Sequence, residues 1–259
     1  MPQYNNSAEN VTKILTLFTD VRPRIGISEF SRELGLSKTT AFNLVRTLVK
    51  EGFLAYNEEV RKYELGKRIA NLAYTMSANL EINQKGAGIV QELSSSYGFT
   101  CHLGIWGEGT VIVIFSCSPS HSLQLHSYQA GPTVAAYCSA LGRAMLAYME
   151  RDEVEKYLDQ VTIIKYTEKT KIKKTDIIKE LDKTKARGFS TCDREISASG
   201  SSFGAPVFDR SKYVAGAISI LGYTDQILSP EMKDLPGALC FRAHQISQSL
   251  GYGGSSLLL

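Results

Sequence analysis

Residues 200–204 have the types and spacing of a serine nucleophile. They read Gly-Ser-Ser-Phe-Gly, which matches the G-x-S-x-G pattern, and Asp225 and His244 follow in the Ser, Asp, His order of one class of hydrolase. Ser202 would then attack an ester. A nucleophile elbow, however, needs a strand before the serine and a helix after it, whereas residues 203–208 are β-prone and lead into a turn. The sequence therefore argues against a serine hydrolase, and no catalytic residue is predicted.

Cys192 is a second candidate for chemistry, as the thiol of a redox sensor. It stands near Arg194 in a stretch that we expect to be a loop, and a nearby cation lowers the pKa of a thiol. The five cysteines are widely spaced without a Cys-x-x-Cys pair, which favours reduced and mostly buried thiols. A zinc site would have to be assembled in space from Cys101, His102 and His126, and we predict neither a metal nor a cofactor.

Residues 37–50 carry a polar face that suits contact with DNA. Thr39, Asn43, Arg46 and Lys50 recur at helical spacing, with short polar groups near the start and cations further along. This order suits contact with base edges in a major groove, followed by contact with phosphates. The side chains predicted to contact double-stranded DNA, here and on a nearby hairpin, are Ser37, Lys38, Thr39, Thr40, Phe42, Asn43, Arg46, Lys50, Arg61 and Lys62.

Two short amphipathic helices would position this face. The first covers residues 28–34, with Ser28 as its N-cap and Gly35 as the glycine that closes it. Ser37 is the expected N-cap of the second helix, which reaches Lys50. The second helix carries an apolar stripe at i, i+3, i+4 and i+7, which we expect to be buried: Ala41, Leu44, Val45 and Leu48.

A hairpin follows these helices and completes a winged helix-turn-helix. Residues 53–56 and 61–65 are its predicted strands, and residues 57–60 are its turn. A further helix, expected over residues 10–20 with Asn10 as its cap, precedes the pair. A helix-turn-helix with such a wing indicates DNA binding.

The charge of the chain is concentrated in this part. The 259 residues carry a formal net charge of +3, all of it in residues 1–85, because residues 86–259 hold equal numbers of cations and anions. This bias has the sign that phosphate binding requires. The hydrophobic fraction is that of a globular protein, and neither a membrane-spanning run nor a signal peptide is present, so we expect a soluble cytoplasmic protein without a membrane partner.

The rest of the chain predicts an α+β domain with a largely antiparallel sheet. The expected organisation is a winged helix-turn-helix domain at 1–66, a linker helix at 67–80 and an effector-binding domain at 81–259. The linker helix either contacts a second copy of the chain or packs on its own domain. In the last domain we expect two hairpins (99–106 with 111–115, and 203–208 with 213–221), helices at 139–149, 152–160, 175–187 and 231–250, and a mobile tail at 251–256.

Several motifs together resemble the IclR family of bacterial transcription regulators. In the head, Leu-Ser-Lys-Thr-Thr-Ala-Phe-Asn-Leu-Val-Arg-Thr-Leu at 36–48 is followed by Gly-Phe-Leu at 52–54 and Tyr-Glu-Leu-Gly at 63–66. The resemblance continues at Ser-Ala-Leu-Gly-Arg-Ala-Met-Leu-Ala (139–147), Lys-Ala-Arg-Gly-Phe (185–189), Ala-Pro-Val-Phe-Asp (205–209) and Ala-Gly-Ala-Ile-Ser-Ile (215–220), and so covers about residues 10–250 in the family's order.

The resemblance implies a homodimer or homotetramer that binds a palindromic operator, with a GAF-like C-terminal domain that senses a small molecule, commonly an organic acid. By position, the family's effector pocket maps onto Leu123, Val134, Ala140, Leu141, Asp193, Ser202, Ser219 and Leu221. The chain departs from the family pattern at Leu221, where many relatives have serine, and in the loop 197–202, where the glycine is shifted by one position.

A physical argument from the residues supports a pocket at the same place. Ser139 opens a helix whose first N–H groups, from Ala140 to Gly142, lack partners within the helix and can hold a carboxylate. Gly142 would let a ligand approach closely. Ser202 and Ser219 would donate hydrogen bonds, and Leu123, Val134, Leu141 and Leu221 would form apolar walls. The alternative is that each serine only satisfies local backbone.

Overall fold

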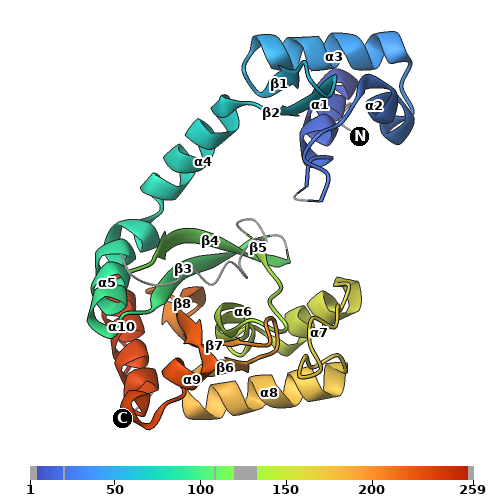
Figure 1. Cartoon of the computed structure of the whole chain (residues 1–259). Coiled ribbons are helices and arrows are strands. Elements are labelled where there is room, and N and C mark those ends of the chain that lie inside the picture. The colour runs from blue at the N-terminus through green and yellow to red at the C-terminus, as the bar shows by residue number, and fades with distance from the viewer. Residues whose placement is uncertain (1–4, 20, 108, 120–132, 256–259) are drawn as a thin grey trace. The chain divides into compact units, whose positions relative to one another are not determined.

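The chain forms two units, Met1–Ala78 and Asn79–Leu259. The computed structural model in Figure 1 describes residues 5–19, 21–107, 109–119 and 133–255. Leu123 and His126 therefore lie outside the described residues, as do position 20 and the end of the tail. Among the described residues, no helix has the length and apolar character needed to cross a membrane.

The first unit begins with three helices, α1 (Asn6–Thr16), α2 (Ile27–Leu34) and α3 (Lys38–Lys50). Helix α1 begins four residues earlier than predicted, because Asn5 and not Asn10 is the cap and accepts the N–H groups of Ser7 and Ala8 at 2.9 and 3.2 Å. The cap predicted at Ser28 is also wrong. Helix α2 starts after Gly26, whose N–H donates to the Glu29 carboxylate at 2.8 Å.

The turn between α2 and α3 has the predicted geometry. Gly35 lies in the left-handed region at φ 65°, and the Ser37 hydroxyl accepts the N–H of Thr40 at 3.1 Å as the N-cap of α3. The predicted stripe of α3 is buried except for Leu44, which is partly buried. The fully or nearly fully buried side chains of this unit are Ile14, Ile25, Phe30, Ala41, Val45, Leu48 and Leu54.

The predicted wing is an antiparallel pair of β1 (Leu54–Asn57) and β2 (Lys62–Leu65). Ile25, just before α2, bridges to Tyr63 through two reciprocal backbone hydrogen bonds of 2.9 Å. These bonds join the wing to the segment that starts α2, and the buried Leu54 and the Tyr63 ring, which contacts Phe30, also hold the wing against the helices.

Helix α4 (Lys67–Asn79) confirms the predicted helix after the wing. None of its residues is buried, so it does not pack its apolar side into its own domain. Leu72, Tyr74 and Met76 remain 52%, 76% and 50% exposed.

The second unit is built on a six-stranded antiparallel sheet in the order β5-β4-β3-β8-β7-β6. Both predicted hairpins are present, as β3 with β4 and β7 with β8. Edge strand β6 was not predicted, because it is short and polar. The strands are β3 (Thr100–Gly107), β4 (Thr110–Cys117), β5 (Thr133–Val134), β6 (Ser190–Asp193), β7 (Gly200–Phe208) and β8 (Val214–Tyr223).

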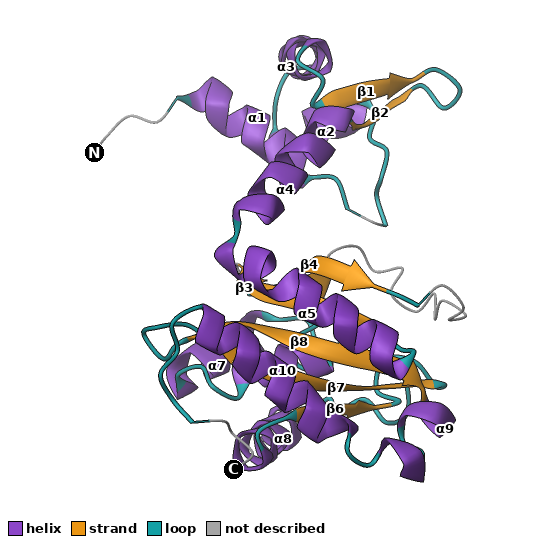
Figure 2. Ribbon diagram, turned by 90° about the vertical axis from the view of Figure 1, so that its left-hand side faces the viewer, coloured by secondary structure: helices purple, strands orange, loops and turns teal. Residues whose placement is uncertain are grey.

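Helices cover both faces of this sheet. On one face lie α5 (Glu81–Tyr97) and α10 (Leu235–Ser249), side by side (Figure 2), packed on Leu103, Val207 and Ile218. We call this the α5/α10 face. The opposite face, which we call the α6 face, is covered by α6 (Ala140–Leu146), with α7 (Arg151–Gln160) and α8 (Lys174–Arg187) beyond it. A short helix α9 (Thr224–Ile227) follows β8.

The C-terminal part differs from the sequence prediction at two points. Helix α10 starts at Leu235 rather than near residue 231, because Pro236 inside a longer helix would clash with a preceding carbonyl; a separate 3₁₀ turn covers Pro230–Met232. The start of the tail is anchored, since the ring of Tyr252 stacks on Phe208 with centroids 5.1 Å apart.

Candidate DNA interface and effector site

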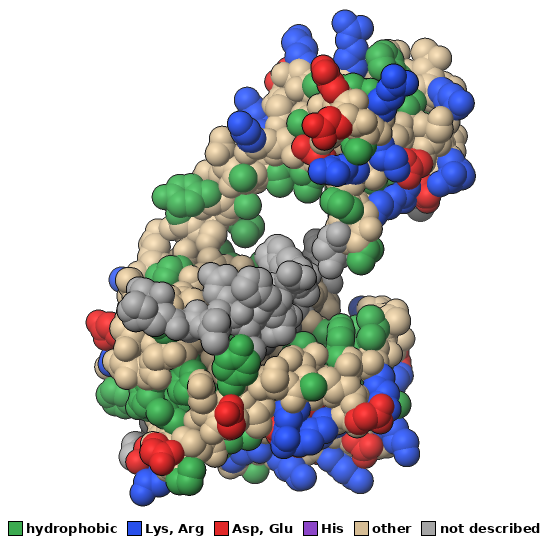
Figure 3. Space-filling view, in the orientation of Figure 1, with side chains coloured by type: hydrophobic (Ala, Val, Ile, Leu, Met, Phe, Trp, Pro, Cys, Tyr) green, Lys and Arg blue, Asp and Glu red, His purple; other side chains and the backbone are tan. Residues whose placement is uncertain are grey.

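The polar face of α3 is exposed, opposite the buried stripe. Thr39, Asn43, Arg46 and Lys50 are all exposed, and Figure 3 shows Lys and Arg side chains projecting from the head on the side of α3. Neither Arg46 nor Lys50 forms an ion pair within the part of the chain that the structure describes. These cations are therefore available to a partner.

Two of the other side chains predicted to contact DNA, Ser37 and Thr40, form hydrogen bonds within α3. The hydroxyls of Ser37 and Thr40 lie 2.8 Å apart and both serve the N-cap. Lys38 is exposed, and the ring of Phe42 is 44% exposed rather than packed in the core. The start of α3 thus presents one cation and one apolar ring beside the polar face.

The two cations of the wing differ in their surroundings. Arg61 lies in the turn, is exposed, and has a positive φ of 53°. Lys62, one residue on, is half-buried, and its Nζ lies 3.0 Å from Oε2 of Glu29. The structure therefore presents Arg61 outward and pairs Lys62 within the head.

Three of the predicted effector residues share the α6 face of the sheet. Ser202 of β7 lies directly opposite Leu221 of β8, and Ser219 lies opposite Gly204. All three side chains are at least 94% buried. Because side chains alternate along a strand, and Phe203 and Ile220 face α5 and α10, these residues point to the other side.

His102 belongs to the same cluster, although the sequence suggested it only as a possible zinc ligand and not as an effector residue. It pairs directly with Ser219 across β3 and β8, and it is 95% buried. Burial lowers its pKa to about 4, so it is a neutral imidazole at neutral pH. The alternation of residues 99–106 was the available signal, since it puts His102 on the face opposite Cys101 and Leu103.

Helix α6 packs on this face through its first turn. A Cβ on Gly204 would lie 2.4 Å from the carbonyl oxygen of Ala140, and one on Gly104 would lie 2.6 Å from Leu141, so both glycines are needed for this close approach. Ala140 and Leu141 are buried. The predicted effector residues at the start of α6 therefore lie directly over the polar cluster of the sheet.

The start of α6 corrects two details of the predicted pocket. The N–H of Gly142 is already occupied, because it donates to the capping Ser139 hydroxyl at 3.0 Å. The missing side chain of Gly142 makes room for the backbone of Ala136, whose Cα would lie 2.2 Å from a Cβ, rather than for a ligand. The N–H groups of Ala140 and Leu141 remain the candidates for a carboxylate.

Asp193 does not lie with the other predicted effector residues. It is paired with Ser201, one residue before Ser202, and therefore points to the opposite side of the sheet. Its carboxylate contacts Lys169 at 2.6 Å and Arg194 at 2.9 Å. Burial alone would raise its pKa, but these cations and the Ser201 hydroxyl lower the pKa to about 2. Val134 lies in β5, where its backbone pairs with Val111.

Comparison with known proteins identifies the family. The family model described as Bacterial transcriptional regulator IclR C-terminal matches residues 74–248, and the model described as IclR helix-turn-helix domain matches residues 7–58. The chain belongs to the IclR family.

Relatives of this IclR-family chain match it over nearly its whole length. The HTH-type transcriptional regulator KdgR of Escherichia coli strain K12 is 27% identical over 97% of this chain and 95% of its own length. The crystal structure of an IclR transcriptional regulator from Alicyclobacillus acidocaldarius shares the fold, with a TM-score of 0.81, 22% identity, and coverage of 96% of this chain and 100% of that one. An IclR homologue from Microbacterium hydrocarbonoxydans, complexed with 4-hydroxybenzoate, has a TM-score of 0.77 at 19% identity and covers 95% and 99%.

The hydrolase interpretation does not fit this IclR-family structure. Ser202 lies inside β7 and not on a turn between a strand and a helix. Its side chain points to the α6 face, whereas His244 belongs to α10 on the opposite face. The serine and the histidine are therefore separated by the sheet.

The two alternatives based on cysteine are also at odds with the geometry. Cys192 lies in strand β6 and not in a loop, it is 96% buried, and burial raises its pKa despite the nearby charge of Arg143. A reactive thiol needs the opposite shift. Cys101 and His102 are consecutive in β3 and point to opposite faces, so they cannot bind the same zinc ion.

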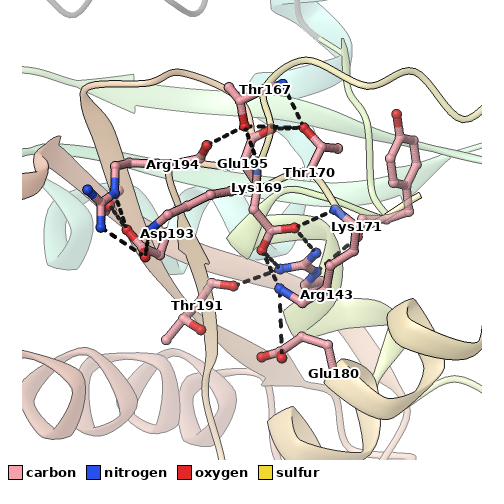
Figure 4. A network of polar contacts seen from close by, with 12 residues as sticks. Arg143, Thr167, Lys169, Thr170, Lys171, Glu180, Thr191, Asp193, Arg194 and Glu195 are labelled. Atoms are coloured by element: carbon pink, nitrogen blue, oxygen red, sulfur yellow. Dashed lines mark hydrogen bonds and ion pairs between the residues drawn. The ribbon is translucent and has the colours of Figure 1, made fainter. Parts of the chain in front are cut away.

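A buried ion pair between Arg143 of α6 and Glu195 holds this helix in place (Figure 4). Arg143 is completely buried and contacts the Glu195 carboxylate with both terminal nitrogens, at 2.6 and 2.7 Å. It also donates to the carbonyl oxygens of Tyr137 at 2.9 Å and Thr191 at 3.0 Å. Lys171 reaches Glu195 at 2.8 Å. This network joins the helix above the polar cluster to β6 and to the segment before α8.

Proposed function

We propose that this IclR-family regulator binds a palindromic DNA operator through the exposed face of α3, with Arg61 of the wing on the phosphate backbone. The observation that carries the proposal is the availability of Arg46 and Lys50 beside Thr39 and Asn43 on that face. A helix of this kind reads base edges in the major groove. Since it acts on DNA, we place the protein in the cytoplasm.

We further propose that a small organic acid binds on the α6 face of the second unit and changes operator affinity. The polar cluster of Ser202, Ser219 and His102 supplies hydrogen-bonding groups, Leu141 and Leu221 supply apolar walls, and the start of α6 supplies N–H groups. The carboxylate 4-hydroxybenzoate in the Microbacterium homologue supports this class of ligand. Binding alters DNA affinity only if the ligand favours one arrangement of the protein over another.

The effector proposal is tested by titrating small carboxylic acids into a preformed complex of the full chain with labelled operator DNA. We expect at least one acid to change the fluorescence anisotropy of the complex in a saturable way. Ser219→Ala should weaken that response, and Ser249→Ala, an exposed serine of α10, should not. A panel of acids that alters neither DNA binding nor the fluorescence of Trp106 would contradict the proposal.

We also propose that the protein is a homo-oligomer, with α4 as one contact between copies. Ile69, Leu72, Ala73 and Met76 follow one side of α4, and no residue of this helix is buried within the chain. A second copy of the same helix would cover this side.

Leu72→Glu should dissociate such an oligomer. A two-fold contact loses two leucines, each worth about 1.5–3 kcal/mol when buried, so we expect the dissociation constant to rise roughly 100-fold or more. Tyr74→Glu is the matched control, because Tyr74 is 76% exposed and lies on the other side of the helix. Sedimentation equilibrium measures both variants. Equal effects of the two substitutions, or none, would remove α4 from the interface.

A further inference from the structure

Glu29 of α2 makes three polar contacts, and one of them, with Lys62, reaches the wing. Its Oε2 accepts the N–H of Gly26 at 2.8 Å and lies 3.0 Å from Nζ of Lys62. Its Oε1 lies 3.6 Å from Arg22, which also contacts Glu33 at 3.4 Å. The Glu29 side chain is only 28% exposed and that of Lys62 is 42% exposed, so this pair is partly shielded from solvent.

We propose that Glu29 withholds Lys62 from DNA, so that Arg61 and not Lys62 supplies the charge of the wing. This inference rests on the proposed DNA-binding function and concerns the charge of the same surface. A cation on a protein strengthens DNA binding by neutralising a phosphate and releasing a counterion from it. The Lys62 ammonium is already paired with the Glu29 carboxylate, so a phosphate placed there gains less than it would from an unpaired cation.

The backbone of the wing does not depend on this ion pair. The bridge between Ile25 and Tyr63 fixes β2 beside the start of α2, with both hydrogen bonds at 2.9 Å. Glutamine at position 29 keeps an oxygen that can accept the N–H of Gly26. Glu29→Gln therefore changes the charge beside Lys62 while the wing keeps its place.

The experiment compares four full-length proteins: the wild type, Glu29→Gln, Lys62→Gln and the double variant. Fluorescence anisotropy measures their affinity for a labelled B-form duplex of arbitrary sequence over a range of salt concentrations. Each neutralised phosphate contributes about 0.9 to the slope of log affinity against log salt. We expect Glu29→Gln to bind DNA more tightly than the wild type, with a salt slope steeper by about 0.9 per wing. Lys62→Gln made in the wild type should change the slope by much less than about 0.9. The same substitution made in the Glu29→Gln background should change the slope by about 0.9.

Glu33→Gln is the matched control. It removes the same charge from the same helix one turn further on, but Glu33 contacts Arg22 and Arg32 rather than Lys62. We expect the effect of Lys62→Gln to stay small in this background. Thermal melting of each variant checks that the head remains folded.

Two results would overturn the inference. One is a change of about 0.9 per wing when Lys62→Gln is made in the wild type, because Lys62 would then already contact phosphate. The other is an equal effect of Lys62→Gln on the slope in the Glu29→Gln and Glu33→Gln backgrounds. That result would indicate that any lost negative charge on α2 has the same effect, whether or not it contacts Lys62. If the wild type shows no salt-sensitive DNA binding, the proposed function itself fails; if it binds without this coupling, only the role of Glu29 fails.

Discussion

Arg143→Met should lower the free energy of unfolding of the second unit by about 3–5 kcal/mol, because it leaves the Glu195 carboxylate buried with a single remaining cation. The guanidinium has no exposed surface, and Glu195 is 98% buried. The carbonyl oxygens of Tyr137 and Thr191 also lose a donor. A loss of this size is a large part of the stability of a typical domain, which is about 5–15 kcal/mol.

Urea denaturation followed by the fluorescence of Trp106 measures this effect. Trp106 is the single tryptophan of the chain and packs against Tyr157 in the second unit, with ring centroids 5.3 Å apart. Arg151→Met is the control, since the Arg151 and Asp182 side chains are 49% and 59% exposed, and such a pair contributes about 0–1 kcal/mol. Equal stability of Arg143→Met and the wild type would contradict the role of the pair. Should Arg143→Met not fold, Arg143→Lys and the double variant Arg143→Met with Glu195→Met provide milder comparisons.

The difference in the free energy of unfolding between the wild type and Arg143→Met should become smaller in acid. Burial alone would raise the pKa of Glu195, but hydrogen bonds and charges from Arg143 and Lys171 outweigh it and hold the pKa below its ordinary value. A lowered pKa in the folded state stabilises the protein above the pKa of the unfolded chain, about 4.3 for a glutamate, and this contribution is lost as the pH falls through the lower, folded value. Urea titrations at neutral pH and at about pH 3 compare the two proteins on either side of the unfolded value.

Arg46→Ala should weaken binding to a specific operator by about 1–3 kcal/mol per head, or roughly 5- to 150-fold, if Arg46 contacts a base edge. Arg46 is exposed on α3 and forms no ion pair among the described residues, so its removal should leave the stability of the head within about 0.5 kcal/mol of the wild type. The loss should be larger on the operator than on a duplex of arbitrary sequence, because a base contact depends on sequence whereas a phosphate contact does not.

Arg32→Ala is the matched control for charge. Arg32 lies on α2, its side chain is 71% exposed, and its contact with Glu33 is a long 3.5 Å. Competition binding with operator and arbitrary duplexes separates the two variants. Should Arg46→Ala weaken both duplexes equally, Arg46 contacts phosphate only; should it weaken neither, α3 does not carry the DNA face.

The sequence predicted the head well because its signals are local. The left-handed turn at Gly35 and the cap at Ser37 each depend on neighbouring residues, and both are present. The predicted start of α2 was wrong because serine is a common N-cap, and Ser28 was therefore chosen. In the structure the Glu29 carboxylate accepts the N–H of Gly26 instead.

The second unit was harder to predict because its features depend on distant contacts. Helix α5 was not predicted. It contains Gly86, which lowers the helix propensity of the segment but allows close packing on Leu103 and Ile246. Strand β6 exists only by pairing with β7. Because β6 was not predicted, the alternation of side chains along a strand could not show that Asp193 and Ser202 point to opposite faces of the sheet. Arg143 and Glu195 lie 52 residues apart, so their pairing left no local signal.

Footprinting the full-length protein on the DNA upstream of its neighbouring genes tests the central claim most directly. We expect protection of two inverted half-sites whose centres lie about 10–10.5 base pairs apart, or a multiple of this, with an affinity that falls as salt rises. The absence of protection, together with no salt-sensitive retention of any promoter fragment, would contradict the claim that the head binds duplex DNA.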